Sequence, residues 1–180
     1  IGGNYAYVAD EAIGIHSGLR VINISDPANP QEVGNFVTES YGFGLAVSGN
    51  YLYVAANYSG LRVLDISNPA DLQEVGFYDT PGLSYDVAVN GNYAFMADWG
   101  SGLRVIDISN PMSPSEVGYY DLPNKTTGVD ISGDYAYVVD YTVGSTTTAY
   151  EKSGLHIIDI SNPNMPQELS YFQTPNIAAG

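Results

Sequence analysis

The chain has 180 residues, of which 44% are hydrophobic, and its five Lys and Arg against twenty Asp and Glu give a net charge of −15. Charge of this sign repels phosphate backbones and anionic lipid surfaces, so nucleic acid is a poor partner, and no apolar run approaches the roughly 18 residues that membrane insertion needs. The absence of cysteine excludes disulfides and thiolate metal sites.

Four short sequence motifs rich in apolar residues, called words below, recur in a fixed order along the chain and predict four repeat units. The first unit holds GNYAYVAD at 3–10, SGLRVINISDP at 17–27 and QEVGNF at 31–36. The second unit adds GLAVSG at 44–49, which is followed by words at 49–56, 59–69 and 73–78. The third unit repeats them at 86–91, 91–98, 101–111 and 115–120, and the fourth at 128–133, 133–140, 153–163 and 167–172. Successive SGLRV-type words begin 42, 42 and 52 residues apart.

Each word is predicted to be a β-strand, because it is rich in Val, Ile, Tyr and Leu and is bounded by turn residues. Four antiparallel strands per unit, at a period in the low forties, predict an all-β fold, a β-propeller built from four four-stranded antiparallel blades of about 42 residues. A parallel solenoid is the alternative. The units of this single domain, 1–180, are approximately 1–42, 43–84, 85–126 and 127–180, and the fourth carries an insertion at 141–152.

The LRVID core of SGLRVIDISNP, together with the preceding GNYAFMAD, resembles the LVIVD repeat, a family of β-propeller-type repeats of bacterial and archaeal surface proteins. The resemblance runs over nearly the whole chain and implies a propeller at a cell surface, with no shared reaction or cofactor. Two positions depart from it. Asn23 stands where the other units have Asp65, Asp107 and Asp159, and His156 stands where they have an arginine.

The residues that recur once per unit are predicted to be structural. Arg20, Arg62 and Arg104 hold one position of the third strand, so we interpret them as internal salt bridges or carbonyl-binding groups; a ligand clamp is the alternative. The Asp, Ser and Asn of the DISNP segment suit turns in which short side chains bond nearby backbone amides. Function is therefore expected where the units differ.

The units differ in the loops after the second and fourth strands, which open on the same face of an up-and-down propeller. These loops are expected to gather aromatic residues into one interaction face: Tyr41, Phe43, Tyr58, Tyr85, Trp99, Tyr141 and Tyr150. Tyr and Trp are enriched at protein interfaces, which favours a protein partner. Aromatic rings among Asn, Asp and Thr also suit sugar binding, and half-buried structural tyrosines are the third interpretation.

Catalysis has little support in the sequence, and we expect no enzyme. His16 and His156 are the only histidines, and neither a nucleophile elbow nor metal-protease spacing occurs. A glycan-active hydrolase with paired carboxylates stays an alternative, because two acids suffice for it. No cofactor is expected, with calcium as the one possibility, since Asp10, Asp98 and Asp140 end second strands on the variable face.

Three sequons bear on the location of the protein. Asn57 and Asn124 fall in predicted loops and are candidate glycosylation sites, whereas Asn23 falls in a strand. Together with the acidic, cysteine-free composition and the family resemblance, they favour an extracellular or cell-surface structural or interaction protein, a glycoprotein in a cell that glycosylates.

The two ends of the chain are expected to share between them the first strand that the first unit lacks. An unpaired strand edge recruits a strand, which could come from the chain's own tail in a small closed ring, from the tail of another copy, or from further repeats of a longer parent protein. We expect head-to-tail association with another copy, or with another surface protein, that could extend into a filament. The expected contact joins Ile1, Gly2 and Gly3 of one copy to the segment of another that holds Thr174, Pro175 and Ile177.

Overall fold

A computed structural model describes residues 1–10, 18–38, 44–141 and 153–174, and all regular structure in these residues is β-strand. No helix in this part of the chain is long and apolar enough to cross a membrane. The strands form four separate antiparallel sheets, each with its strands hydrogen-bonded in chain order. The all-β prediction is confirmed, and the four sheets correspond to the four predicted blades.

The strands of each sheet follow the predicted words. Sheet 1 contains β1 (Tyr5–Asp10), β2 (Gly18–Asn23) and β3 (Gln31–Val37). Sheet 2 contains β4 (Leu45–Ser48), β5 (Tyr51–Ala55), β6 (Leu61–Asp65) and β7 (Gln73–Tyr78). Sheet 3 contains β8 (Asp86–Asn90), β9 (Tyr93–Ala97), β10 (Leu103–Asp107) and β11 (Ser115–Tyr120). Sheet 4 contains β12 (Lys125–Ser132), β13 (Tyr135–Tyr141), β14 (Gly154–Asp159) and β15 (Gln167–Gln173).

Two details differ from four regular blades. Sheet 1 has three strands in the described residues, as expected for a unit that lacks its first word. Sheet 4 begins at Lys125, two residues before the expected start of its unit at 127. Of the expected insertion 141–152, Tyr141 is the last residue of β13, and the remainder lies outside the described residues.

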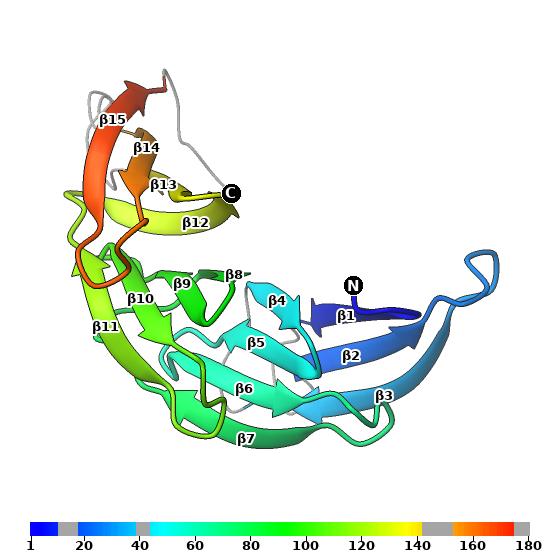
Figure 1. Ribbon diagram of the computed structural model, residues 1–180. Helices are drawn as coiled ribbons and strands as arrows, with labels where there is room; N and C mark the ends of the chain where they lie inside the picture. The colour runs from blue at the N-terminus through cyan, green and yellow to red at the C-terminus, as the bar shows by residue number, and fades with distance from the viewer. Residues whose placement is uncertain (11–17, 39–43, 142–152, 175–180) are drawn as a thin grey trace.

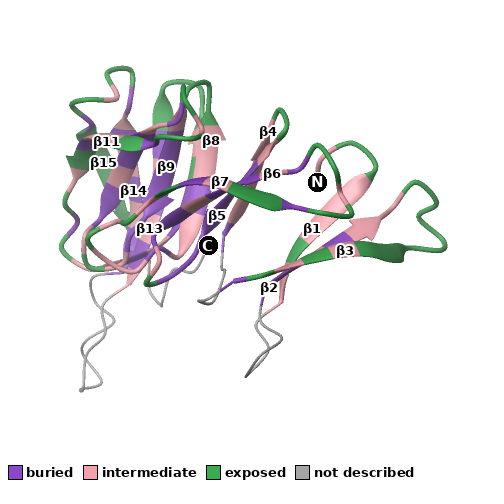
Figure 2. Cartoon of the chain, turned by 90° about the horizontal axis from the view of Figure 1, so that it is seen from below, coloured by how far each residue is buried: buried purple, intermediate pink, exposed green. Residues whose placement is uncertain are grey.

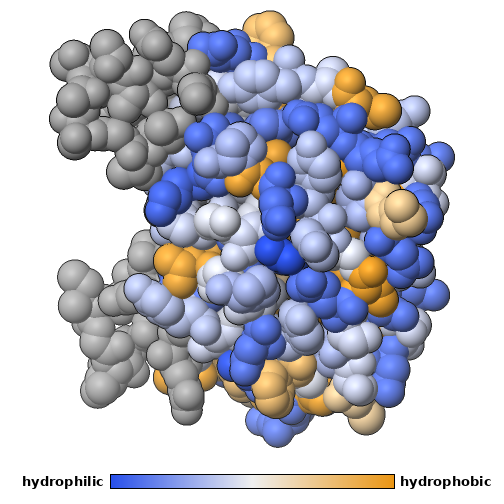
Figure 3. Space-filling model, turned by 90° about the vertical axis from the view of Figure 1, so that its left-hand side faces the viewer, coloured by the Kyte–Doolittle hydropathy of each residue, from blue (hydrophilic) through white to orange (hydrophobic). Residues whose placement is uncertain are grey.

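The four sheets follow one another along an open arc (Figure 1). Their first strands, β4, β8 and β12, line the inside of the arc, and their last strands, β7, β11 and β15, lie outside, while sheets 1 and 4 stand at its two ends. The side that carries β11 and β15 is largely hydrophilic, with isolated hydrophobic residues (Figure 3). The arc therefore has a polar outer rim and two terminal sheets, each with a neighbour on one side.

Apolar residues on both faces of the strands explain why the sheets stack. One core lies between each pair of successive sheets, and Phe95, Leu103 and Val105 of sheet 3 pack there against Val138 and Ile158 of sheet 4. The second strands of sheets 2 and 3, β5 and β9, are buried almost completely, whereas β1, the corresponding strand of sheet 1, has only intermediate or exposed residues (Figure 2). The burial of a strand therefore depends on how many sheets flank its own sheet, because the sequences of corresponding strands are nearly the same.

Each outer strand carries the same bulge, and in sheets 1 to 3 the residue after the bulge lies close to the backbone of the next sheet. In β11 the register with β10 shifts between Val105 and Ile106, which leaves Val117 as the extra residue. At the following Gly118, an added Cβ would lie 2.1 Å from the backbone carbonyl oxygen of Pro163 in sheet 4. Gly34 and Gly76 meet Pro69 and Pro111 of the next sheet in the same way. Sheets 1 to 3 therefore need glycine here so that the next sheet can approach.

The DISNP segments form the expected turns. The Oδ1 of Asp107 accepts a hydrogen bond from the backbone N–H of Ser109 at 2.8 Å, and Asp65 and Asp159 do the same in their sheets. Asn23 keeps this bond to Ser25 at 2.9 Å, so its departure from the repeat leaves the turn intact. These residues are structural, as predicted.

Candidate functional site

The arginines that recur once per unit form ion pairs within their own sheets. Arg20 pairs with Asp10 and Glu32, Arg62 with Glu74 and Asp79, and Arg104 with Glu116 and Asp121, at 3.0 to 3.5 Å. Arg62 and Arg104 also lie 4.7 and 4.8 Å from the ring centres of Phe77 and Tyr119 on the next strand. Their charges are occupied inside the sheet, which confirms the salt-bridge interpretation over the ligand clamp.

His156 occupies the arginine position in sheet 4 and is 4% exposed. Its Nδ1 lies 2.7 Å from Glu168 and its Nε2 lies 3.1 Å from the buried Asp140, while its ring packs 4.6 Å from that of Tyr171. Burial opposes protonation of the imidazole, but the hydrogen bonds and charges of Asp140 and Glu168 outweigh it and raise the pKa of His156 above its ordinary value. At the position where the other sheets have an arginine, sheet 4 therefore has a side chain that is a cation only while His156 is protonated.

We expect the stability of the protein to fall as the pH rises past neutral because of His156. The pKa is raised in the folded state, so its stabilising contribution is complete below about pH 6.5 and is lost as the pH rises through the folded-state pKa. Thermal melts at pH 6 and pH 9 should show a fall in melting temperature in the wild type that is absent from His156→Arg. Parallel pH profiles of the two proteins would contradict this assignment.

The three aspartates considered for calcium are held by protein groups instead. Asp98 is fully buried and accepts hydrogen bonds from the hydroxyls of Thr80 and Ser84 and from the backbone N–H of Gly82, at 2.7 to 3.0 Å. Asp140 is also fully buried and accepts bonds from Asn124 and from the backbone of Gly154.

Asp10 pairs with Arg20 at 3.2 Å. The described residues contain no group of three or more His, Asp or Glu side chains that could hold a metal ion. Asp98 and Asp140 therefore tie the loop before the first strand of a sheet to the end of its second strand.

The aromatic face is only partly within the described residues. Tyr41, Phe43 and Tyr150 lie outside them. The structure brings Tyr85, Trp99 and Tyr141 together: Tyr85 stacks on Trp99 with ring centres 4.7 Å apart, and Tyr141 meets the indole edge-on at 5.6 Å. Tyr58 is 78% exposed in the equivalent loop of sheet 2. The loops after the second and fourth strands therefore do converge, as the sequence predicted.

Lys125 completes this cluster and was not predicted. Its ammonium lies 4.5 Å from the ring centre of Trp99, a cation–π contact. The backbone of Trp99 has φ of 44° and forms a bridge to Thr126 of the next sheet, which fixes the indole beside β12. The sequence offered one sign that Lys125 has a specific contact, because it is one of only five Lys and Arg residues in the chain. We name Tyr85, Trp99, Lys125 and Tyr141 the aromatic cluster.

The predicted exposure of one sequon is wrong. Asn57 is 6% exposed, with φ of 47°, and its backbone exchanges two hydrogen bonds with Ser84 of the next sheet. It is the counterpart of Trp99 and does not offer its amide to solvent. Asn124 is half-buried and donates from Nδ2 to Asp140 at 2.8 Å. A glycan on Asn124 stays a prediction, and it would leave Nδ2 a single N–H for the bond to Asp140. Asn23 ends β2 as expected.

Four of the residues expected to join copies lie in the described residues, in or next to sheets 1 and 4 at the ends of the arc. Ile1 is 82% exposed, Gly3 is in a turn with φ of 56°, and Gly2 bonds to Tyr5 and packs against sheet 2. Thr174 bonds through its N–H and its hydroxyl to the carbonyl of Ser153, so it extends its own sheet. Pro175 and Ile177 lie outside the described residues.

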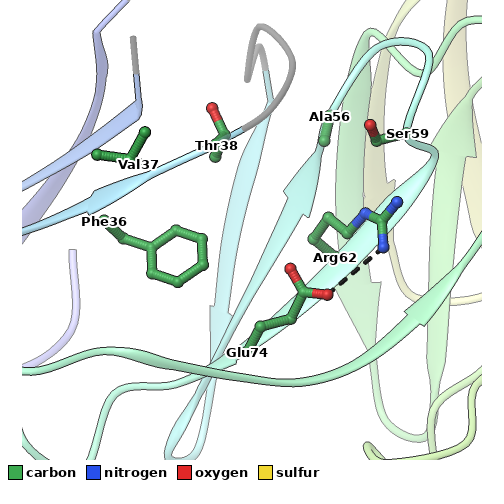
Figure 4. Close-up of a pocket in the computed structure, with 7 residues that line it drawn as sticks. All are labelled: Phe36, Val37, Thr38, Ala56, Ser59, Arg62 and Glu74. Carbon is green, nitrogen blue, oxygen red and sulfur yellow. Dashed lines mark hydrogen bonds and ion pairs between the residues drawn. The ribbon is translucent and has the colours of Figure 1, made fainter. Parts of the chain in front are cut away.

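A cavity of about 280 Å³ opens between sheets 1 and 2 (Figure 4). Its lining comprises Phe36, Val37, Thr38, Ala56, Ser59, Arg62 and Glu74. Ala56 holds the position that is Asp98 in sheet 3, and the shorter side chain leaves this space beside Arg62. The guanidinium that borders the cavity already pairs with Glu74 and Asp79, so the cavity offers a ligand little free charge.

Comparison with known proteins identifies the repeat and the fold. The LVIVD repeat matches residues 1–38, 42–80, 81–122, 123–144 and 148–174, the last two segments together spanning sheet 4. The crystal structure of the computationally designed Ika8 protein is similar over 99% of this chain and 49% of that chain, with 14% identity and a TM-score of 0.69.

A functionally unknown protein from Desulfotomaculum acetoxidans DSM 771 is similar over 97% of this chain and 54% of that chain, with 13% identity and a TM-score of 0.77. The chain thus spans about half the length of both solved structures. No curated protein matches it.

Proposed function

Since the chain belongs to the LVIVD repeat family, we propose that it is a non-enzymatic interaction protein of the cell surface or the extracellular space, which binds a partner protein through its aromatic cluster. The observation that carries this proposal is the contact of Trp99 with Tyr85, Tyr141 and Lys125 on the face where the variable loops converge. Trp, Tyr and cationic side chains of this kind are typical centres of protein interfaces.

The net charge of the chain indicates which kind of partner protein it can bind. With a net charge of −15, the chain attracts positively charged surfaces, and exposed arginines or lysines of a partner can stack on the exposed ring of Tyr58. The two buried aspartates near this face, Asp98 and Asp140, accept hydrogen bonds from protein donors, which supports a binding role over a hydrolytic one. The partner we propose is therefore a protein with a basic binding surface.

The surface location rests on composition and family. The acidic charge and the absence of cysteine suit a polar outer rim facing solvent, and the family resemblance implies surface proteins. Asn57 no longer contributes to this argument because it is buried. Fractionation of the producing cells, with the protein found in the medium or accessible to protease on intact cells, tests this part of the proposal.

The binding proposal is tested with two tyrosine or tryptophan variants. Trp99→Ala removes the centre of the aromatic cluster, and we expect at least a tenfold loss of partner captured by cross-linking on the producing cells, about 1.4 kcal/mol. The matched control is Tyr135→Ala, because Tyr135 is 42% exposed at the opposite end of β13 from Tyr141. Equal capture by wild type and Trp99→Ala would show that this cluster is not the interface.

A carbohydrate ligand is the second candidate for the face of the variable loops, since a sugar ring can stack on the exposed ring of Tyr58. Trp99 is the single tryptophan of the chain, so its fluorescence reports this site directly. A change of emission with defined oligosaccharides, together with glycan-array binding that Trp99→Ala abolishes, would replace the protein partner by a glycan.

Self-association head to tail is the other part of the proposal. Among the described strands β1 pairs with β2 alone, and its other edge is bridged at Tyr5 by Gly2, so the part of that edge after Tyr5 is available to another chain. A chain that repeats this contact builds a filament when the contact does not close on itself, and a ring when it does. Light scattering on the purified chain distinguishes a monomer from either assembly.

A further inference from the structure

The outer face of sheet 4 keeps the apolar residues that bury the other sheets against their next neighbour. Leu155 and Ile157 hold the positions of Leu103 and Val105, which are 0% exposed in sheet 3, but both are half-exposed. Phe172 holds the position of Tyr120, which packs against sheet 4. It is 67% exposed, and Leu169 at the bulge position is 57% exposed. This face, with Tyr137 and Val139, has the composition of an inter-sheet core and no covering sheet in the described residues.

The outer face of sheet 1 keeps the matching set. In sheet 2 the side chains that point to the preceding sheet are Leu52, Val54, Leu64 and Ile66, all in one core with sheet 1. Their counterparts in sheet 1 are Ala6, Val8, Ile22 and Ile24. Val8 is 47% exposed, and the other three are half-exposed. Terminal repeats of stable arrays normally carry a polar outer face, and neither end of this arc does.

The two faces are complementary because they are the two sides of the same repeated interface. Sheet 4 presents the side that packs on a following sheet, and sheet 1 presents the side that packs on a preceding one. In the two solved structures described above, about half of the chain corresponds to all of this one, and a second half of similar length remains. In propellers, blades repeat radially around a central channel, which leaves only short and protected strand edges.

We infer that a second copy of this chain covers both faces, so that two arcs close into one ring in which sheet 4 of each copy packs on sheet 1 of the other. The inference rests on the self-association proposed above and makes it a closed pair with two equivalent joints. In this ring the two copies are joined by face-to-face packing of sheets, as sheets 1 to 4 are joined within one copy. No strand of one copy has to pair with the edge of β1 in the other.

One residue makes this joint different from the interior ones. Ser170 stands where sheets 1 to 3 have Gly34, Gly76 and Gly118, the glycines that touch a proline carbonyl of the next sheet. A Cβ at 2.1 to 2.3 Å from that carbonyl is not tolerated, so the Pro27 loop of the second copy must lie farther from Ser170. The joint is therefore looser at its outer rim, and Ser170→Gly should tighten the pair.

The test is the mass of the purified chain by sedimentation velocity and light scattering. We expect twice the 19.2 kDa of one chain. Phe172→Asp and Val8→Asp each place a charge in one face, and each should weaken association about tenfold or more. Mixing the two variants should restore pairing in part, because one joint then has both faces intact. Met112→Asp is the control, since Met112 is 68% exposed on a turn away from both faces.

The outcomes separate the ring from the broader proposal. A monomer at every concentration overturns both the ring and self-association. An open polymer overturns the ring and leaves head-to-tail association. A pair that Phe172→Asp abolishes but Val8→Asp does not would be a symmetric contact between two copies of sheet 4, which also overturns the ring. An unchanged affinity in Ser170→Gly would show that the Pro27 loop is not the neighbour of Ser170. Circular dichroism shows that each variant is folded.

Discussion

Gly118→Ala is expected to lower the melting temperature by about 6 to 12 °C, which corresponds to about 3 kcal/mol in a chain of this size. The added Cβ would lie 2.1 Å from the carbonyl oxygen of Pro163. Side-chain rotation cannot relieve this contact, because the backbone of residue 118 fixes the Cβ and the oxygen belongs to the backbone of Pro163. Sheets 3 and 4 must then separate at the rim, which opens the core around Phe95 and Ile158. Thermal unfolding followed by circular dichroism measures the effect.

Ser170→Ala is the matched control, because Ser170 is exposed at the same position of the fourth outer strand. It should leave the melting temperature within about 1 °C, as surface substitutions usually do. Gly76→Ala should behave like Gly118→Ala, since the carbonyl of Pro111 lies at the same distance. If Gly118→Ala and Ser170→Ala were equally harmless, close approach of the sheets would not be the reason for the glycine.

The repeated words predicted the strands well because each word carries the signals of a strand and its turns locally. The SGN hairpin between β4 and β5 is an example: Gly49 has φ of 59°, as the turn requires. The order and the antiparallel pairing of the strands follow from such short connections. The shape of the arc does not follow from them, because it depends on how closely one sheet packs on the next.

Contacts between neighbouring strands and sheets were the part that sequence reasoning missed. The glutamate partner of Arg104 was not identified, because the bulge after Val105 changes the register that brings Glu116 to it. Asn57 looked like an exposed loop residue, but its backbone pairs with Ser84 of the next sheet. Such pairings join segments that are far apart in the sequence, so a local pattern does not reveal them.

The candidate site was predicted in outline because the topology alone decides which loops converge. Tyr85 and Trp99 come from different loops and stack, as the alternation of faces in an up-and-down blade implies. The contribution of Lys125 depends on its side chain crossing to the indole from the next sheet, which the strand order does not fix. The chemistry of the three aspartates suggested calcium, and the sequence did not reveal which protein groups surround them in the fold. Asp98 accepts from the hydroxyls of Thr80 and Ser84, whereas Asp140 accepts from Asn124 and from the backbone of Gly154.

Asp98→Ala is expected to destabilise the protein by about 3 kcal/mol, because it leaves buried donors without their acceptor. The carboxylate is 0% exposed and accepts from Thr80 at 2.7 Å, from the N–H of Gly82 at 2.7 Å and from Ser84 at 3.0 Å. Hydrogen bonds to a charged group are worth roughly 1.5 to 3 kcal/mol each, and the backbone N–H of Gly82 donates one of them to this carboxylate. Urea unfolding at pH 7 measures the loss.

The same substitution should also weaken the aromatic cluster, because the residue after Asp98 is Trp99 and the loop that Asp98 holds carries Tyr85. We therefore expect a change in the fluorescence of the single tryptophan in Asp98→Ala before unfolding begins. Asp121→Ala is the control: its side chain is 71% exposed in an ion pair with Arg104, and exposed pairs contribute about 0 to 1 kcal/mol. If Asp98→Ala cost no more than Asp121→Ala, the buried carboxylate would not be what holds this loop in place.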